Sequence, residues 1–451
     1  MTGSGSQIVA DAEYEQTLAR AAAVDVAKAT GMVCVRGPNP DRPSVRLTRV
    51  WEVSATTRAI SEVADQLSAE GVEMVTLEAT SDYWRPWFYL LEAAGVPVQL
   101  VNARDVKNVP GRPKTDKLDA VWLAKLTERG MLRPSFIPPT EIRVLRDYTR
   151  MRSDLVHEQS RYWQRIEKLL EDALIKVSSV ASTMTGVSVR AMLEALIAGE
   201  RDPQVLAELA RGKLRIKRAA LVEALTGRFD AHHAELARML LDQIDRLTRD
   251  IDQLTTRIET LIAEIPAAQG VDVDGTTGPE AGRAVDAIIL PVIDQLDQIT
   301  GVGREVAQVI VAEVGLNMNQ FPSAAHLASW AKISPRTVQS GNKKVSGRTG
   351  RGNPYLKSAL ANAAVASART DTFLGERYRR LVKRIGKGRA LVALQRSILV
   401  IVYELLSDRT SRYHDLGAGY YASRTDTDKK ARNHIRQLQA LGFQVTIAPA
   451  A

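Results

Sequence analysis

The sequence predicts a mixed α/β and helical protein, in which an α/β domain comes first and helices follow. Strand and helix signals alternate over residues 21 to 130, isoleucine and leucine repeat at heptad spacing over 244–265, and a basic, glycine-rich stretch follows residue 331. A chain of 451 residues is too long for one hydrophobic core, so several domains are expected. We expect them at 1–135 (α/β domain), 136–265 (helical and coiled-coil region), 266–285 (linker), 286–410 (mainly helical C-terminal domain) and 411–451 (extension).

The N-terminal domain is predicted to run strand, strand, strand, helix, strand, helix, strand, helix. Apolar stretches rich in β-branched residues mark the strands, and apolar residues at spacings of three and four mark the helices. The predicted strands are AAAVDVA, GMVCVRG, VRLTRVWEVS, VEMVTLEAT and VPVQLVNA. This order is that of an RNase H-like domain. In the last helix, which begins near KTDKLDA, we expect Leu118, Trp122 and Leu126 to form the buried stripe.

Four acidic residues of this domain have positions that suit one metal site. Asp25 interrupts the first apolar strand, where an unpaired charge is costly to bury, and Glu78 ends the fourth strand. Asp116 and Asp119 share one face of the last helix, although their spacing alone is more typical of a solvated first turn. In an RNase H-like sheet the first and fourth strands are neighbours. We therefore expect the four carboxylates to converge and to suit Mg²⁺ (or Mn²⁺), the alternative being four unrelated surface acids.

The central region carries a coiled-coil pattern. Isoleucine occupies every a position and leucine every d position, namely Ile244, Leu247, Ile251, Leu254, Ile258, Leu261 and Ile265. Parallel two-stranded coiled coils prefer this pattern, so contacts with the same segment of a second protomer are expected. The alternative is packing within the chain against the long amphipathic helix expected at 141–176. His232 and His233, near the start of the heptad helix, are expected to be polar surface residues.

The charge distribution indicates a polyanionic partner. The chain has a net charge of +9, but residues 331–400 hold 16 Lys and Arg against two acids, a net +14, which leaves −5 for the remainder. Such a basic segment is typical of a nucleic-acid contact surface, with a solvated lysine-rich face as the alternative. The turn at Gly301 and Gly303 resembles a helix-hairpin-helix, a weak motif by itself, which would direct backbone N–H groups at a phosphate. The basic residues between nearby glycines are Lys343, Lys344, Arg348 and Arg351.

Cysteine content and hydropathy favour the reducing cytosol. Cys34 is the single cysteine, which excludes an internal disulfide framework and a Cys-rich zinc site. The N-terminus has neither the basic nor the apolar region of a secretion signal. The most apolar helical stretch, ALVALQRSILVIVYELL, is interrupted by Gln395 and Arg396, so we expect a buried helix and no membrane partner.

The blocks VDVAK, LEATSDYW, VNARDVKNVPGRPKTDKLDA and ASWAKISPRTVQSGNKKVSGRTGRGNPYL resemble the insertion sequence 110 family of transposases, which are bridge-RNA-guided DEDD recombinases. The resemblance implies a RuvC-like domain, a coiled coil and a C-terminal transposase domain. It places the acidic tetrad on Asp25, Glu78, Asp116 and Asp119 and the nucleophilic serine on Ser340. It also implies a divalent metal, donor and target DNA, a structured noncoding guide RNA and a homo-oligomer, either a dimer or a tetramer.

The function expected from this resemblance is cutting and rejoining of DNA through a phosphoserine intermediate, in the bacterial cytosol or nucleoid. Spacing alone would leave Ser334 and Ser346 as competitors of Ser340. One alternative is a RuvC-like structure-selective nuclease that uses metal-activated water, for which Ser340 would be dispensable. Another is a non-catalytic nucleic-acid-binding protein, although the presence of all four acids weighs against it. Residues 176–230 and the tail after residue 410 look longer than the family's usual plan, so no role is carried onto them.

Overall fold

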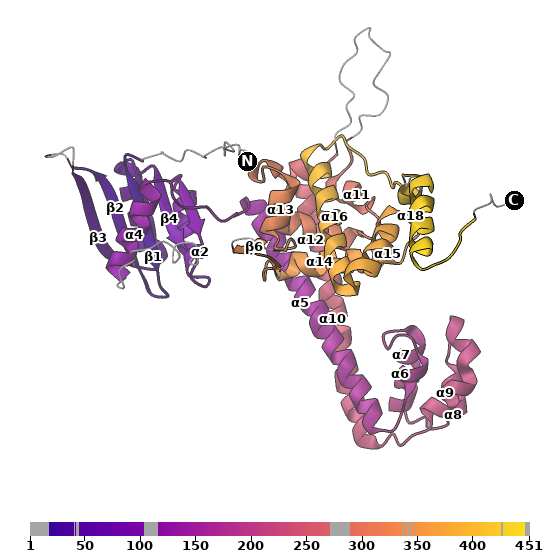
Figure 1. Ribbon diagram of the computed structural model, residues 1–451. Helices are drawn as coiled ribbons and strands as arrows, with labels where there is room; N and C mark the ends of the chain where they lie inside the picture. The colour runs from indigo at the N-terminus through magenta and orange to yellow at the C-terminus, as the bar shows by residue number, and fades with distance from the viewer. Residues whose placement is uncertain are drawn as a thin grey trace, which may run out of the picture. The chain divides into compact units, whose positions relative to one another are not determined.

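The computed structural model describes residues 18–39, 41, 45–102, 116–270, 289–335, 337–340, 343–347, 349–424 and 427–446. The chain divides into two compact units, Met1–Ile137 and Pro138–Ala451 (Figure 1). We call the first the sheet unit and the second the helical unit. Residues 138–265 and 286–410, which belong to two regions expected as separate domains, fall within the helical unit.

The sheet unit contains a five-stranded mixed sheet with the order β3-β2-β1-β4-β5. Its strands are β1 (Ala21–Val26), β2 (Thr30–Pro38), β3 (Arg46–Ser54), β4 (Met74–Glu78) and β5 (Val98–Val101). The first three strands pair antiparallel, whereas β4 lies parallel to β1 and β5 lies parallel to β4. The predicted adjacency of the first and fourth strands is therefore confirmed.

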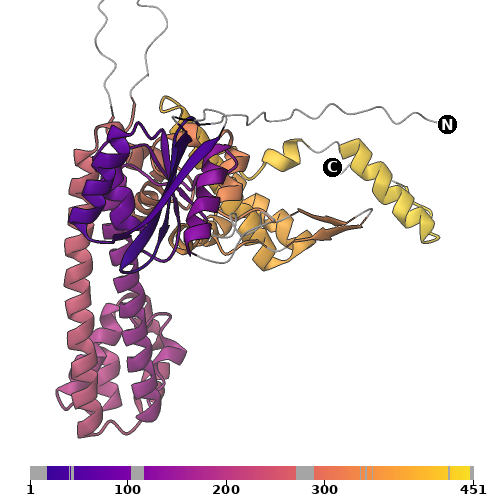
Figure 2. The same cartoon turned by 90° about the vertical axis from the view of Figure 1, so that its left-hand side faces the viewer.

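Helices cover both faces of this sheet (Figure 2). On one face, α1 (Thr57–Ala69) and α2 (Trp84–Ala93) pack against the even-numbered residues of β1, such as Ala22 and Val24. On the other face, α4 (Asp116–Glu128) packs against the odd-numbered Ala23. Alternate side chains of a strand point to opposite faces, so the parity of a β1 residue tells which helix layer it meets.

The predicted buried stripe of α4 is wrong at its first residue. Leu118 is 45% exposed, while Ala120, Leu123 and Ala124 are buried against the sheet. The two alanines are small, so the helix backbone can lie close to the strands, and the buried face is centred on them. The helix is therefore rotated about its axis from the predicted orientation.

The helical unit is built around two long helices, α5 (Thr140–Asp172) and α10 (Ala231–Glu264), which pack along one another (Figure 1). Between them in the sequence come short helices that share one hydrophobic core with the ends of both. These are α6 (Val177–Val180), α7 (Val187–Ile197), α8 (Pro203–Glu208), the 3₁₀ helix η1 (Gly212–Lys217) and α9 (Arg218–Leu225). Residues 176–230 are thus a small helical subdomain at the tip of the long helices.

The heptad stripe is largely buried within the chain. Ile244, Leu247, Ile258, Leu261 and Ile265 are each less than 10% exposed, and α5 is the principal neighbour of α10. A partner helix in the same chain requires no association step, so it has the advantage of a high effective concentration. These side chains therefore pack within the chain, as the alternative to a two-stranded coiled coil predicted. Contact of this segment with a second protomer stays a prediction.

The rest of the helical unit gathers around α16 (Lys387–Ser407), which packs against α11, α13, α14 and α15. These helices are α11 (Val292–Asp297), α12 (Arg304–Val314), α13 (Ala324–Trp330), α14 (Pro354–Ala368) and α15 (Phe373–Ile385), with short 3₁₀ turns η2 (Pro266–Ala268) and η3 (Met318–Gln320). The final elements are α17 (Tyr420–Ser423) and α18 (Thr427–Ala440). By length and composition α16 could cross a membrane, with a mean hydropathy of 1.7, but eight of its side chains are buried, as in a core helix.

A buried carboxylate joins α5 to the C-terminal core. Glu313 of α12 is fully buried and receives two hydrogen bonds from Arg150, at 2.7 and 2.8 Å. Arg146 forms a second ion pair with it, at 3.3 Å. The side-chain amide of Asn353, which caps α14, donates to the same carboxylate at 2.5 Å. Opposite charges and hydrogen bonds therefore compensate the cost of burying Glu313.

Candidate active site

The register of β1 and β4 brings two of the predicted acids side by side. The parallel ladder pairs Val24 with Leu77, and the next residues along the two strands are Asp25 and Glu78. Neighbouring strands lie about 4.8 Å apart, so these acids occupy adjacent positions at the end of the ladder. Asp25 is half-buried and Glu78 is only 7% exposed. Two carboxylates at this spacing repel each other unless positive charge compensates them.

Both acids face the α4 side of the sheet. Asp25 follows Ala23 by two residues, and Ala23 packs on α4. Glu78 follows Thr76 by two residues, and the hydroxyl of Thr76 lies 2.7 Å from that of Thr127 near the end of α4. The strands therefore direct Asp25 and Glu78 towards the layer that carries the other two predicted acids.

The first turn of α4 lies at the same end of the sheet as these acids. The backbone N–H of Leu18, just before β1, donates to the carbonyl of Glu128, so α4 ends where β1 begins and runs opposite to it. Asp119 lies eight residues before Thr127, about 12 Å along the helix, while Glu78 lies about 7 Å beyond Thr76. The difference of roughly 5 Å along the axis is within the reach of the side chains.

The rotation of α4 places Asp119 on the buried side of the helix. Asp119 precedes Leu123 by four residues and Leu126 by seven, and both leucines are buried. Its own side chain is half-buried. Asp116 begins α4 and has the corresponding spacing to Ala120 and Leu123; its side chain lies outside the described residues. The fold thus brings Asp25, Glu78 and Asp119 to the same end of the sheet, where β1 and β4 end and α4 begins. We call this end of the sheet the acidic edge.

Ser340 belongs to the helical unit, in a short hairpin that the sequence did not predict. It is the last residue of β6 (Thr337–Ser340), opposite Lys343, the first residue of β7 (Lys343–Ser346). The side chains of both strands lie outside the described residues. The backbone therefore places the serine at the tip of a hairpin, with Lys343 and Lys344 on the returning strand.

The other residues predicted to bind nucleic acid are two arginines that follow the hairpin and two glycines of the turn before α12. Arg351 is exposed beyond the hairpin, whereas Arg348 lies outside the described residues. Gly303 is the exposed N-cap of α12, and a side chain there would meet open space. Gly301 adopts φ +85°, and a Cβ atom there would come within 2.5 Å of the carbonyl oxygen of Ala363 in α14. Close packing against α14 therefore explains why glycine is needed at this position.

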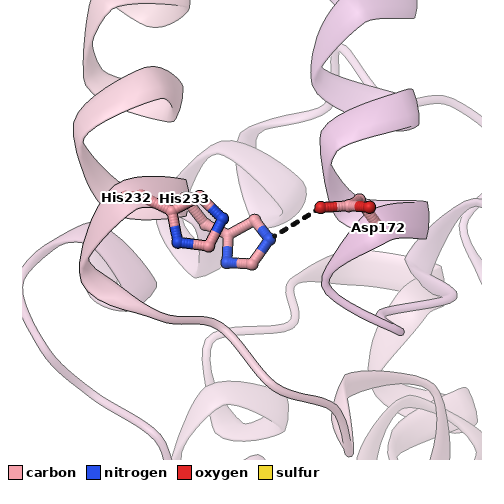
Figure 3. Close-up of side chains that lie close together, drawn as sticks. All are labelled: Asp172, His232 and His233. Carbon is pink, nitrogen blue, oxygen red and sulfur yellow. Dashed lines mark hydrogen bonds and ion pairs between the residues drawn. The ribbon is translucent and has the colours of Figure 1, made fainter.

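A second group of candidate metal ligands lies where α5 and α10 approach each other, at Asp172, His232 and His233 (Figure 3). The expectation that both histidines are surface residues is wrong for His233, which is 3% exposed. Its Nδ1 accepts the backbone N–H of Asp230 at 3.0 Å, which leaves Nε2 to donate to Asp172 at 3.1 Å. Both ring nitrogens are thus engaged in capping α10 and tying it to α5, so the described geometry is that of a structural cap.

Two protein-family models match the chain. Residues 22–175 match the transposase model of the DEDD proteins of insertion sequence IS110, and residues 293–379 match the transposase model of the IS116/IS110/IS902 family. Together they span more than half of the sequence and include β1, β4, α4 and the hairpin of Ser340. The chain belongs to the IS110 family of transposases.

Individual relatives of this transposase cover smaller parts of it. A segment of 149 residues is 33% identical to the insertion element IS110 uncharacterized 43.6 kDa protein of Streptomyces coelicolor. That segment is 31% of this chain and spans about a third (36%) of the relative. Among solved structures, Thermus thermophilus RuvC and the T. thermophilus RuvC complex with a Holliday junction substrate align with 26% of this chain and 99% of theirs, at 15% and 14% identity and a TM-score of 0.20.

Proposed function

We propose that this transposase cuts and rejoins DNA by metal-dependent phosphodiester transesterification, guided by a structured noncoding bridge RNA. The observation that carries the proposal is the β1–β4 register, which sets Asp25 beside Glu78 on the face covered by α4. The same helix begins with Asp116 and carries Asp119 one turn later. Acids on three separate elements thus support one carboxylate site, in a chain of a transposase family.

The carboxylates fit a divalent-metal site. Hard oxygen ligands are those preferred by Mg²⁺ and Mn²⁺, and adjacent like charges at low exposure favour binding of a cation. Asp25, Glu78, Asp116 and Asp119 would hold the ions. When bound, such ions supply Lewis-acid stabilisation of the attacking and leaving oxygens of a phosphoryl displacement. The protein's own contribution is to fix the carboxylates on two strands and a packed helix, so that the site is formed before DNA binds.

Ser340 is the proposed nucleophile, as the family resemblance implies. Its Oγ attacks the scissile phosphorus, an ester bond from Oγ to phosphorus forms, and the bond from phosphorus to a deoxyribose oxygen breaks. The serine proton is released and the departing sugar oxygen gains one, so one ester replaces another without an external energy source. Attack of a second sugar hydroxyl on the phosphoserine reverses this exchange and joins new strands. A serine hydroxyl requires activation for this step.

The serine and the acids belong to different units of the chain. Transesterification therefore requires that the hairpin of β6 and β7 meet the acidic edge, either within one chain or between protomers. The resemblance favours the second arrangement, in a dimer or a tetramer. The basic segment around the hairpin, with Lys343, Lys344 and Arg351, supports binding of donor and target DNA and of the guide RNA, since each neutralised phosphate releases counterions.

Trapping of a covalent adduct tests the proposal. The protein is purified with its bound nucleic acid, the RNA is sequenced and transcribed, and the complex is incubated with Mg²⁺ and a nicked DNA containing the site that the RNA pairs with. We expect a protein–DNA adduct that resists denaturant, and none with Ser340→Ala. Ser334→Ala and Ser346→Ala are the matched controls and should still form it.

The same experiment separates the two classes of reaction. A Ser340→Ala protein that still cuts the DNA, with free strand ends and no adduct, would contradict the phosphoserine step and favour hydrolysis by metal-activated water at the same carboxylates. Asp25→Asn should prevent both the adduct and cutting. Persistence of either activity in that variant would contradict the carboxylate site itself.

A further inference from the structure

The C-terminal extension, which lies beyond the residues matched by the family models, completes a pocket on α15. The pocket has a volume of about 270 Å³ and is lined by Arg377, Arg380, Leu381, Arg384 and Tyr421. The arginines are spaced at i, i+3 and i+7, so they share one face of α15. Tyr421 comes from α17, in the tail to which the sequence assigned no role.

These three arginines differ from their neighbour Arg379 in how their charge is compensated. Arg379 points away from them and pairs with Glu376 at 2.9 Å and with Asp371 at 3.2 Å. Within the described part of the chain, no carboxylate pairs with Arg377, Arg380 or Arg384. Three guanidinium groups around one pocket without an acid leave a concentrated positive charge, which favours an anionic ligand.

Neutral groups hold two of the arginines in place. Arg377 donates to the hydroxyl of Ser397 at 2.8 Å and to the hydroxyl of Tyr421 at 3.0 Å. The guanidinium of Arg380 lies 4.2 Å from the centre of the Tyr421 ring. Hydroxyl acceptors and an aromatic face orient a guanidinium while leaving its full charge available to a ligand. The pocket is therefore preorganised, which reduces the conformational entropy lost on binding.

The aromatic ring of Tyr421 is unavailable for stacking on a base. Phe373 stacks on it at a centroid distance of 5.4 Å with an interplanar angle of 16°, and Arg380 lies against the ring as well. A nucleotide at this pocket would therefore be bound through its phosphate.

We propose that α15 and α17 form a sequence-independent site for consecutive backbone phosphates of a polynucleotide strand. Arg380 and Arg384 contact the phosphates, and Tyr421 positions Arg377 and Arg380. The inference rests on the proposed function, because it assumes that the protein acts on nucleic acid. It assigns part of the basic segment 331–400 to a defined surface, at a distance in sequence from Ser340 and built partly from residues beyond the matched region.

The salt dependence of binding tests this site in the full-length protein. Binding to a labelled 20-base-pair DNA duplex of arbitrary sequence, and to an RNA duplex of the same sequence, is measured by fluorescence anisotropy over a range of salt concentrations. For B-DNA each phosphate contact contributes roughly 0.9 to the slope of log K against log salt. Arg380→Gln combined with Arg384→Gln should therefore reduce the slope by about 1.8 on the nucleic acid that the pocket binds.

Arg379→Gln is the control, because it removes one positive charge from the same helix on the side compensated by acids, and its slope should equal that of the wild type. Thermal melting checks that every variant is folded. A reduced slope with DNA, with RNA or with both supports the site and identifies its ligand. Unchanged slopes on both duplexes, with wild-type binding intact, overturn the site and leave the proposed function standing. Absence of wild-type binding to either duplex overturns both.

Discussion

Two glutamates of this transposase, Glu313 and Glu78, are both buried, but they differ in the charged residue that the fold places beside them. Glu313 in the helical unit lies among Arg146, Arg150 and the amide of Asn353. Glu78 in the sheet unit lies in register beside Asp25, on the face covered by the helix that carries Asp119. The first arrangement compensates a negative charge with positive ones, whereas the second sets one carboxylate next to another.

This difference distinguishes the structural role of Glu313 from the metal-binding role that we propose for Glu78. A carboxylate that is fully paired by arginines holds elements together, and removing it leaves buried cations without a partner. Carboxylates placed next to one another lower stability unless a cation binds, and such arrangements are typical of sites whose purpose is to bind that cation.

The largest effect is expected from replacing single acids of the sheet edge. Asp25→Asn, Glu78→Gln or Asp119→Asn should lower the rate of DNA cutting by at least about a thousandfold, because each removes a ligand of the proposed metal site. Binding of the proposed guide RNA should be retained, since the basic segment lies elsewhere in the sequence. Asp65→Asn, at an exposed position of α1, is the control and should cut normally. Normal cutting by any of the three variants would remove that residue from the site.

Glu313→Gln should mainly lower the free energy of unfolding, whereas the substitutions at the acidic edge mainly lower the rate of DNA cutting. It leaves Arg146 and Arg150 without their carboxylate, which should cost about 3–5 kcal/mol of unfolding free energy for the helical unit. Glu78→Gln should cost about 1 kcal/mol or less, because it relieves repulsion from Asp25. Urea unfolding followed by circular dichroism measures both. Equal losses in the two variants would show that the two glutamates have the same structural role.

Divalent metal should stabilise the sheet unit of the wild type. At a hundredfold excess over its dissociation constant, Mg²⁺ or Mn²⁺ should add about 2.7 kcal/mol to the stability of this unit. The double variant Asp25→Asn, Glu78→Gln should show no such gain. His232→Ala, in the second group of candidate metal ligands, should keep it. Thermal unfolding with and without metal measures the effect. A gain that survives in the double variant would place the bound ion elsewhere.

The smallest effect concerns Cys34, which lies on the same α4 face as the acids but within its apolar part. Burial raises the pKa of this thiol from 9.0 to about 12. Since the thiol ionises more readily in the unfolded chain, its contribution to stability is complete below pH 9 and is lost as the pH rises towards 12. At pH 10 the loss should be about 1.4 kcal/mol relative to pH 8, and it should be absent in Cys34→Ala. If the wild type and Cys34→Ala lost the same stability between pH 8 and pH 10, burial of the thiol would not be the cause.

The sequence by itself determined the order of strands and helices in the sheet unit and the adjacency of β1 and β4. Apolar runs, strand-type residues and turn signals are local properties, and the connection rules for such units leave few topologies. Once β1 and β4 are neighbours, the positions of Asp25 and Glu78 within their strands suffice to bring them together. The role of Ser340 came from resemblance, because its spacing alone would leave Ser334 and Ser346 as equals.

Only the tertiary structure decided which face of each helix is buried and against what. A heptad stripe requires an apolar surface to pack against. In this chain α5 provides that surface, which a second protomer could also provide. The small residues Ala120 and Ala124 are the ones that α4 buries against the sheet, although Leu118 is the more apolar residue. Likewise, His233 and Glu313 are polar residues whose burial is explained only by partners distant in sequence, Asp172 for the first and two arginines of α5 for the second. Periodicity reports that a residue can be buried, but the free energy of burying it depends on partners that only the folded chain brings together.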